Sequence, residues 1–369
     1  VIFLRITILT NGPGELWGWV RPVVKELRKR GHSVSLWLLP CQFASGHERE
    51  AASLLGVDKL EGPASASRIW QDIATEKTDR IIQLGGDIIF GLRMSEKSKA
   101  PLTIYNYWAR KDIKGAKLLT AYVSQQSKNA PSAVAIGDIV KDALEMDITQ
   151  SAINAWNWPK LENSPRILLM PGSRPVIRNA ALGWLAKMHS CLKKKIPDVR
   201  VRALFSQFMP ESELIQWENA GLHPVRSWAG VAMREADFAL TQPGTNTFEL
   251  MHCGLPALVV APMDFLKFVP ISGALGFLAG LPLVGLKLRK FAALRLVKRW
   301  GGFISLPNRI AGHKAMSEIY GDVTPEDAAE EIFNELRNKE KLKKTRAEFL
   351  ELSGESGAAE RLCDIVLTR

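Results

Sequence analysis

Two successive series of short apolar runs, each alternating with helical stretches, limit the possible folds of this chain more than any other feature. The first series opens with apolar runs at Ile6–Thr10 and Ser33–Leu39, separated by a helical stretch at Arg21–Arg30. Strand, helix and strand in this order are typical of a parallel sheet. Further short apolar runs, bounded by Gly, Pro or charged residues as buried parallel strands are, follow at Arg80–Leu84, Leu102–Tyr105 and Ala133–Ile136.

The second series begins after a stretch rich in Asn, Trp and Pro, Thr149–Pro165, which we interpret as a linker. Its apolar runs and one long helical stretch are Ile167–Met170, Ala180–Lys195, Val199–Phe205, Phe238–Thr241 and Ala257–Val260. A chain of 369 residues is about right for two domains. The sequence therefore predicts an α/β fold with two Rossmann-like domains facing a central cleft. Their expected bounds are 1–150 and 166–345, with a terminal helix at 346–369 that can pack back on the first domain.

The net charge and the cysteines limit the possible partners of the protein and indicate its redox compartment. The chain carries 49 basic and 38 acidic residues, and its net charge of +11 favours an anionic partner: nucleic acid, nucleotide phosphate or an acidic membrane face. Its Lys and Arg residues are not gathered with stacking aromatics along one groove, except near Trp300, which argues against nucleic acid. The four cysteines are far apart and form no CxxC pair, which indicates a reducing cytosol. No histidine pair at helical spacing points to a metal, and we expect none.

The first candidate loop follows the apolar run Ile167–Met170 and reads Pro171-Gly172-Ser173-Arg174. Gly172 lets the backbone approach an anion, the N–H groups at the start of the next helix supply partial positive charge, and Arg174 adds a donor fork suited to a diphosphate. The alternative, a tight turn with a solvated Arg, has about equal weight on spacing alone.

A second loop of the same kind follows Phe238–Thr241. It contains Gly244, Thr245, Asn246 and Thr247 and opens a helical stretch with Glu249 one turn inside. Ligands of doubly wound sheets bind beyond the carboxyl ends of the strands, so both loops are expected at one crevice, with Glu249 accepting hydrogen bonds from a ribose diol. Alternatively, Glu249 only stabilises the helix start.

The first half has two corresponding loops. Asn11-Gly12-Pro13-Gly14-Glu15 lacks the GxGxxG spacing, which disfavours an NAD dehydrogenase; Glu15 is either a hydroxyl-binding group or a helix cap. Gly85-Gly86-Asp87 places a carboxylate at a strand end, where it could act as the base that deprotonates an acceptor hydroxyl. On local sequence, capping of the next helix is the more favoured role of Asp87.

A possible membrane contact lies at 268–300. Residues 268–286 carry no charge, and the basic residues that follow are interleaved with apolar ones. Several Pro and Gly residues interrupt a spanning helix, so we expect insertion into the surface of an anionic membrane. The alternative is a core helix pair with a solvated basic face.

As a set, these motifs resemble the lipid-A-disaccharide synthase family. The resemblance rests on Leu168–Arg174, Gly244–Glu249, Ile304–Asn308 with Ile310–Gly312, and Thr324–Glu326 in that order, and more thinly on Tyr105–Arg110 and Ile136–Asp138. It implies the GT-B glycosyltransferase fold, no metal or cofactor besides the UDP-sugar donor, inversion at the anomeric carbon, and peripheral attachment to the inner membrane from the cytoplasm. The family joins an acylated UDP-glucosamine to an acylated glucosamine phosphate.

Carried over residue by residue, the resemblance makes Arg174, Glu249 and Asn308 residues of the UDP site and places Asp87 near the family's acidic candidate base. The family has a Gly-Glu-Ala-Ser-Gly-Asp loop where this chain has Asn11–Glu15, and only the last acidic residue of that loop has a counterpart here, Glu15. The family's Gly-Ile-Asp-Ala-Pro-Asp type of segment is shortened in this chain to Leu84–Asp87. Both departures fall in the half expected to bind the acceptor, so the acceptor can be another lipid or sugar. A homodimer is left open.

Two other functions are compatible with the same residues. A UDP-sugar epimerase would share the two-domain plan but would need further acids around the sugar and no membrane patch. A protein without catalysis could use the charge of +11 to bind a membrane surface or nucleic acid.

Overall fold

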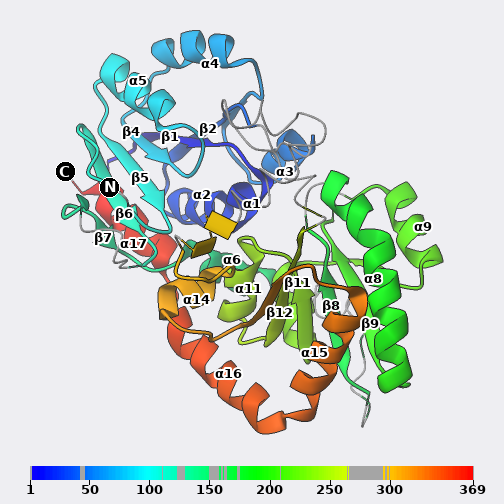
Figure 1. Cartoon of the computed structure of the whole chain (residues 1–369). Helices are drawn as coiled ribbons and strands as arrows, with labels where there is room; N and C mark the ends of the chain where they lie inside the picture. Colours follow the sequence, from blue (N-terminus) through cyan, green and yellow to red (C-terminus); the bar gives the residue numbers. More distant parts are fainter. Residues whose placement is uncertain are drawn as a thin grey trace. The chain divides into compact units, whose positions relative to one another are not determined.

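Two compact units divide the chain in the computed structural model: Val1–Met146 together with Gly354–Arg369, and Asp147–Ser353 (Figure 1). We call them unit 1 and unit 2. The structure describes all residues except Val1, 42–45, Arg110, 123–128, 149–157, 159–160, 162–163, 173–174, Phe208, Asp264, 266–293, Leu296, Arg299 and Arg369.

Unit 1 is built on a parallel sheet with the order β3-β2-β1-β4-β5-β6-β7. The order reverses between β1 and β4, which makes that pair the topological switch point of a Rossmann-like sheet. Residues 6–10 of β1 are all buried, as expected for a parallel strand covered on both faces. The strands are β1 (Arg5–Thr10), β2 (Ser33–Leu38), β3 (Lys59–Glu61), β4 (Arg80–Gln83), β5 (Leu102–Asn106), β6 (Ala116–Thr120) and β7 (Val134–Ala135).

The helices of unit 1 include a π-helix directly after the first candidate loop. They are α1 (Pro13–Glu15), the π-helix η1 (Leu16–Val20), α2 (Arg21–Lys29), α3 (Glu48–Ser53), α4 (Ala66–Asp72), the 3-10 turn η2 (Ile73–Thr75), α5 (Ile88–Ser98), α6 (Ile139–Asp147) and α17 (Ala358–Leu367). The last of these, α17, packs against α2 and buries Leu362, Cys363 and Val366. The end of the described chain is therefore part of the unit that contains its beginning.

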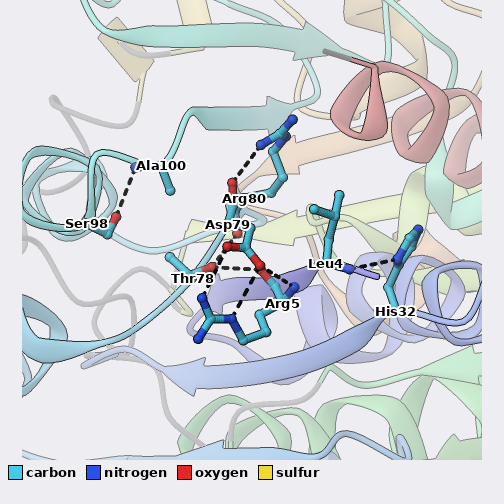
Figure 2. Close-up of polar contacts among 8 residues, drawn as sticks. All are labelled: Leu4, Arg5, His32, Thr78, Asp79, Arg80, Ser98 and Ala100. Atoms are coloured by element: carbon cyan, nitrogen blue, oxygen red, sulfur yellow. Dashed lines mark hydrogen bonds and ion pairs between the residues drawn. The ribbon is translucent and has the colours of Figure 1, made fainter. Parts of the chain in front are cut away.

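The amino ends of β1 and β4 are joined by a group of polar contacts (Figure 2). Asp79 accepts hydrogen bonds from the backbone N–H of Arg5 at 2.8 Å and from its guanidinium at 3.3 Å. The Thr78 hydroxyl lies 3.2 Å from the carbonyl oxygen of Arg5 and 2.7 Å from that of Arg80. These contacts fix the register of the two switch-point strands at the end opposite their candidate loops.

Unit 2 contains a second parallel sheet, with the order β10-β9-β8-β11-β12-β13. This is the strand order of the doubly wound nucleotide-binding fold, and its switch point is between β8 and β11. The strands are β8 (Arg166–Met170), β9 (Arg200–Phe205), β10 (Pro224–Arg226), β11 (Phe238–Thr241), β12 (Ala257–Pro262) and β13 (Ser317–Gly321).

The helices of unit 2 pack in groups around this sheet. Helices α8 and α15 lie together, and α11 contacts both α14 and α16 (Figure 1). Thr324 and Asp327 form a reciprocal capping box at the start of α15, which fixes that boundary. The bounds are α8 (Pro175–Lys195), α9 (Glu211–Asn219), α10 (Ala229–Glu235), α11 (Asn246–His252), α14 (Leu306–Ala311), α15 (Pro325–Arg337) and α16 (Lys339–Ser353).

Each unit has its own apolar core. Ile81, Leu102 and Ile104 belong to a buried cluster of unit 1, and Ile167, Phe238 and Trp217 belong to one in unit 2. The predicted fold class, an α/β fold with two Rossmann-like domains, is confirmed.

Candidate functional site

All four loops singled out in the sequence leave the four strands that form the two switch points. In unit 2, Pro171–Arg174 follows β8 and Gln242–Thr247 follows β11, and these two strands are paired in the sheet. In unit 1, Asn11–Glu15 follows β1 and Gly85–Asp87 comes after β4, and these strands are also paired. Each pair of loops thus lies where the topology opens a crevice for a ligand.

The two loops of unit 2 contact each other. The side-chain amide of Gln242 donates a hydrogen bond to the carbonyl oxygen of Pro171 at 3.4 Å. Gly172 is exposed and has φ = +92°, a conformation that favours glycine. Ser173 and Arg174, which were predicted to complete the anion site, lie outside the described residues.

Within the second loop, the exposed and the buried positions separate clearly. Thr245 is exposed, whereas Gly244, Asn246 and Glu249 are half-buried. Thr247 is fully buried: its hydroxyl donates to the carbonyl oxygen of Gly244 at 2.7 Å and accepts from the backbone N–H of Leu306 at 3.4 Å. The Asn246 amide bonds to the hydroxyl of Thr241. Thr247 therefore closes the loop and ties it to the start of α14.

Asn308, a predicted UDP-site residue, is also fully buried. Its amide nitrogen donates to the carbonyl oxygen of Met316 at 2.9 Å, and its side-chain oxygen accepts from the N–H of Met316 at 2.7 Å. Both ends of the side chain are engaged with the backbone that enters β13. Asn308 thus holds α14 beside the loop after β11.

A buried carboxylate that the sequence did not reveal supports the same region. Glu318 on β13 accepts hydrogen bonds from the N–H groups of Ile304 at 3.2 Å and Ser305 at 2.9 Å. Arg309 donates to the carbonyl oxygens of Phe303 and Ile304 and lies 3.5 Å from the ring centroid of Trp300. Burial lowers the pKa of the Arg309 guanidinium to about 10. No local sequence pattern marks these contacts, because they join residues from separate elements.

A small apolar hollow lies beside the two loops of unit 2. Trp184 on α8 and Phe265 after β12 meet edge to face at 6.2 Å within it. Its other walls come from α8 and from the carboxyl ends of three neighbouring strands: Met170, Pro171, Ala181, Leu185, Leu240, Thr241, Gln242 and Val260. The loops are thus backed by packed apolar side chains, which hold them in place.

In unit 1, the switch point brings Glu15 close to the loop after β4. A Cβ atom at Gly85 would lie 3.1 Å from Cγ of Glu15 and 3.0 Å from Oδ1 of Asn11, so only glycine leaves room for these side chains. The Thr10 hydroxyl donates to the carbonyl oxygen of Leu84 at 2.8 Å, which ties the ends of β1 and β4 together. The half-buried Glu15 therefore lies beside Gly85 at this switch point.

Asp87 is exposed at the start of α5. Its Oδ1 accepts a hydrogen bond from the N–H of Ile89 at 3.0 Å, so the side chain caps this helix, as the alternative interpretation expected. The Gln83 amide nitrogen donates to the carbonyl oxygens of Gly85 and Asp87, at 3.1 and 2.9 Å. Hydrogen bonds therefore fix the loop, and they hold a solvent-accessible carboxylate just beyond the carboxyl end of β4.

Two segments of unit 1 that resemble the family more weakly, the one beginning at Tyr105 and the one ending at Asp138, meet in one network of polar contacts. The Tyr105 hydroxyl donates to the carbonyl oxygen of Gly137 at 3.0 Å and accepts from the N–H of Ile139 at 3.1 Å. Asp138 is almost fully buried and accepts from the Tyr122 hydroxyl at 3.0 Å. Burial, together with the nearby Asp138 carboxylate, raises the pKa of both tyrosines. Both remain neutral hydrogen-bonding groups at physiological pH.

Neither a metal centre nor a membrane span is found in the described part of the chain. No group of three or more His, Cys, Asp or Glu residues there could hold a metal ion. No helix among the described residues has the length and apolar character needed to cross a membrane. The predicted surface-insertion segment, 268–300, lies outside the described residues apart from 294–295, 297–298 and Trp300.

Two Rossmann-like units with loops at both switch points define the architecture of the GT-B class, and solved structures of similar fold agree. MurG of Acinetobacter baumannii is 14% identical with a TM-score of 0.56, covering 98% of this chain and 99% of that chain. The UDP-GlcNAc 2-epimerase of Neisseria meningitidis, solved with UDP-GlcNAc bound, is 13% identical with a TM-score of 0.60, covering 99% and 100%. MnaA of S. aureus, solved with UDP, is 14% identical with a TM-score of 0.59, covering 97% and 94%. At these identities the likeness shows the fold alone.

Sequence comparison then shows which family part of the chain resembles. Residues 136–272 match the family model of lipid-A-disaccharide synthetase, a segment that includes both loops of unit 2. The lipid-A-disaccharide synthase of Wigglesworthia glossinidia brevipalpis is 27% identical over 197 residues, which are 52% of this chain and 45% of that protein. Over these segments the chain is similar to the lipid-A-disaccharide synthase family, and the match spans about half the length of this curated relative.

Proposed function

We propose that the chain is a glycosyltransferase that moves a sugar, an acylated glucosamine, from a UDP donor to a lipid or lipid-sugar acceptor. The observation that carries the proposal is the family match over 136–272, because this segment contains both loops at the β8/β11 switch point. A relative that transfers sugars and structures of the same fold with UDP bound support the donor class. The reaction is of the inverting kind and needs no metal.

In this proposal, the donor diphosphate is held by the two loops of unit 2. Gly172, Ser173 and Arg174 supply backbone N–H groups and a guanidinium, and the exposed Thr245 with Gly244 and Asn246 lines the other side. Positive groups at the phosphates stabilise the departing UDP as its charge develops, which is where binding lowers the barrier. Glu249 binds the ribose, and the buried Thr247 and Asn308 position the loops without contacting the ligand.

The base is assigned to the loops of unit 1. Inverting transfer needs a carboxylate that takes the proton of the acceptor hydroxyl as this hydroxyl attacks the anomeric carbon. Asp87 is exposed at a switch-point loop, and its cap to Ile89 involves only Oδ1 in the described contacts. We assign Asp87 as the base and Glu15 as a group that binds the acceptor hydroxyls.

The acceptor and the location are proposed from the resemblance to the lipid-A-disaccharide synthase family. We propose that residues 268–300 bind an anionic membrane, so that the protein works as a peripheral protein on the cytoplasmic face of the inner membrane. Its basic residues can attract anionic headgroups at about 1 kcal/mol each. A homodimer is compatible with this arrangement.

A UDP-sugar 2-epimerase is the second candidate, because proteins of that activity share the fold over nearly the whole chain. The two functions differ in one requirement. An epimerase converts its UDP-sugar without any acceptor, whereas a transferase releases UDP only when an acceptor hydroxyl is present.

The donor site is tested by the melting temperature of the purified protein. We expect UDP to raise it and Arg174→Ala to abolish the rise, because the guanidinium neutralises the diphosphate. Arg337→Ala, at an exposed position on the last turn of α15, is the matched control and should keep the wild-type shift. An unchanged melting curve at millimolar UDP would contradict the proposal.

The base is tested by Asp87→Asn. We expect UDP binding to persist while acceptor-dependent release of UDP falls by about 100-fold or more, since general-base catalysis contributes on that order. An amide oxygen can still accept the cap from Ile89, so the helix start is kept. Turnover at the wild-type rate would remove Asp87 from this role, and conversion of the donor without acceptor would favour the epimerase.

A further inference from the structure

A group of aromatic side chains lies at the carboxyl end of β5 in unit 1. Trp19, on the π-helix η1, is buried and lies edge to face with Tyr105, with ring centroids 5.2 Å apart, and with Tyr107 at 4.9 Å. Trp108 is 6.2 Å from Tyr107 at a tilted angle. Tyr107 and Trp108 are half-buried, and Asn106 beside them is exposed. The group therefore combines the two buried rings of Trp19 and Tyr105 with two rings that solvent can reach.

This aromatic group lies at the same edge of the unit 1 sheet as the candidate carboxylates Asp87 and Glu15. Gln83 of β4 is paired with Ile104 of β5, so the segment from Asn106 leaves its strand beside the loop Gly85–Asp87. Glu15 lies against Gly85 and precedes Trp19 by about one helical turn. Acidic, amide and aromatic side chains thus come from adjacent loops of one sheet edge.

The backbone of Asn106 and Tyr107 is held in place by hydrogen bonds within the protein itself. The N–H of Ala121 donates to the carbonyl oxygen of Asn106, and the N–H of Tyr122 donates to that of Tyr107, each at 3.0 Å. These bonds extend the pairing of β5 with β6 past the end of the strands. A segment held in this way binds a ligand with little loss of conformational entropy.

The chemistry of these groups selects the ligand. The C–H bonds on one face of a pyranose pack against an aromatic face, while carboxylates and amides form hydrogen bonds with its hydroxyls. An acyl chain on the same surface would remove Asp87, Glu15 and Asn106 from water without replacing their hydrogen bonds, which is unfavourable. We propose that Tyr107, Trp108 and Asn106 form a subsite for the pyranose ring of the sugar acceptor. This inference rests on the proposed function, because it supplies the place for the acceptor beside Asp87.

The test is saturation-transfer NMR of the full chain with octyl β-D-glucopyranoside below its micelle concentration, because this probe contains both a pyranose and an alkyl chain. We expect saturation to reach the ring C–H protons more strongly than the alkyl protons. Trp108→Leu, which keeps apolar volume but has no aromatic face, should weaken binding about three- to tenfold. Trp108→Phe should retain most of it, and Tyr107→Leu should behave like Trp108→Leu. Trp70→Ala, at an exposed tryptophan on α4 of the same unit, is the control and should bind as the wild type does.

Three results would overturn the subsite: saturation confined to the alkyl protons, equal affinity of Trp108→Leu and the wild type, or no saturation at all. The UDP melting shift is measured on the same variants. A normal UDP shift in Trp108→Leu shows that unit 2 is intact, and retained binding by Trp108→Phe shows that unit 1 tolerates a change at this position. Absence of any UDP shift in the wild type, with pyranose saturation retained, would instead contradict the donor function and leave the sugar subsite standing.

Discussion

At the scale of single residues, two threonines two positions apart in the loop after β11 differ completely. Thr245 is exposed, whereas Thr247 is fully buried and uses its hydroxyl both as donor and as acceptor. A sequence pattern of glycine and hydroxyl residues treats them alike. Only the packing of α14 against α11 decides which one is available to a ligand.

Replacing Thr247 by Val tests this difference. The change nearly keeps the shape but removes the hydroxyl's hydrogen bond to the carbonyl oxygen of Gly244, which keeps only the one from the N–H of residue 247, and it takes the hydroxyl acceptor from the N–H of Leu306. We expect a loss of about 1–3 kcal/mol of stability. Urea unfolding measures the loss. The matched variant Thr245→Val should change stability by less than about 0.5 kcal/mol, as exposed substitutions do. Equal midpoints for the two variants would contradict the supporting role of Thr247.

At the scale of elements, the amino ends of β1 and β4 depend on a carboxylate whose protonation can be followed. The hydrogen bond from the Arg5 guanidinium and the one from the Arg5 backbone hold the pKa of Asp79 below its ordinary value. A lowered folded-state pKa means that the stabilisation is present above the unfolded value, about 3.9, and is lost as pH falls through the folded value.

Asp79→Asn should therefore lower the free energy of unfolding at pH 7 and lower it less as pH falls below the ordinary pKa of the carboxyl. Since the Arg5 and Asp79 side chains are 52% and 34% exposed, we expect a difference of only about 0.2–1 kcal/mol. Urea unfolding at pH 7 and pH 3 measures it, with Glu96→Gln on the exposed face of α5 as the control. A loss of equal size at both pH values would show that the charge is not responsible.

The central strands and the position of the loops could be predicted from the sequence, because buried parallel strands are continuous apolar runs. Strands β3, β6, β10 and β13 were not predicted. Three of them, β3, β10 and β13, lie at sheet edges, and all four carry a charged residue: Lys59, Lys117, Arg226 and Glu318. The π-helix at Leu16–Val20 has no signature in residue spacing. The supporting contacts of Asn308 with Met316 and of Glu318 with Ile304 depend on how β13 and α14 pack, which the sequence does not state.

At the scale of the whole molecule, the proposed division of labour assigns the donor to unit 2. Hydrogen exchange measured with and without UDP tests this assignment. We expect slower exchange of the amides of Gly172 and Gly244–Glu249, with stabilisation of about 2.7 kcal/mol when UDP is at 100 times its Kd. Amides of the loops Asn11–Glu15 and Gly85–Asp87 should keep their rates. Protection that appears first in those unit 1 loops would reverse the assignment.

The packing of α17 on α2 also bears on how this molecule is made. Synthesis proceeds from the amino terminus, and domains usually fold as they emerge from the ribosome. Here the residues that cover α2, among them Leu362 and Val366, are translated only after the whole of Asp147–Ser353. Unit 2 can therefore complete its core first. Unit 1 emerges earlier, but the apolar face of α2 stays exposed until the last segment of the described chain has been synthesised.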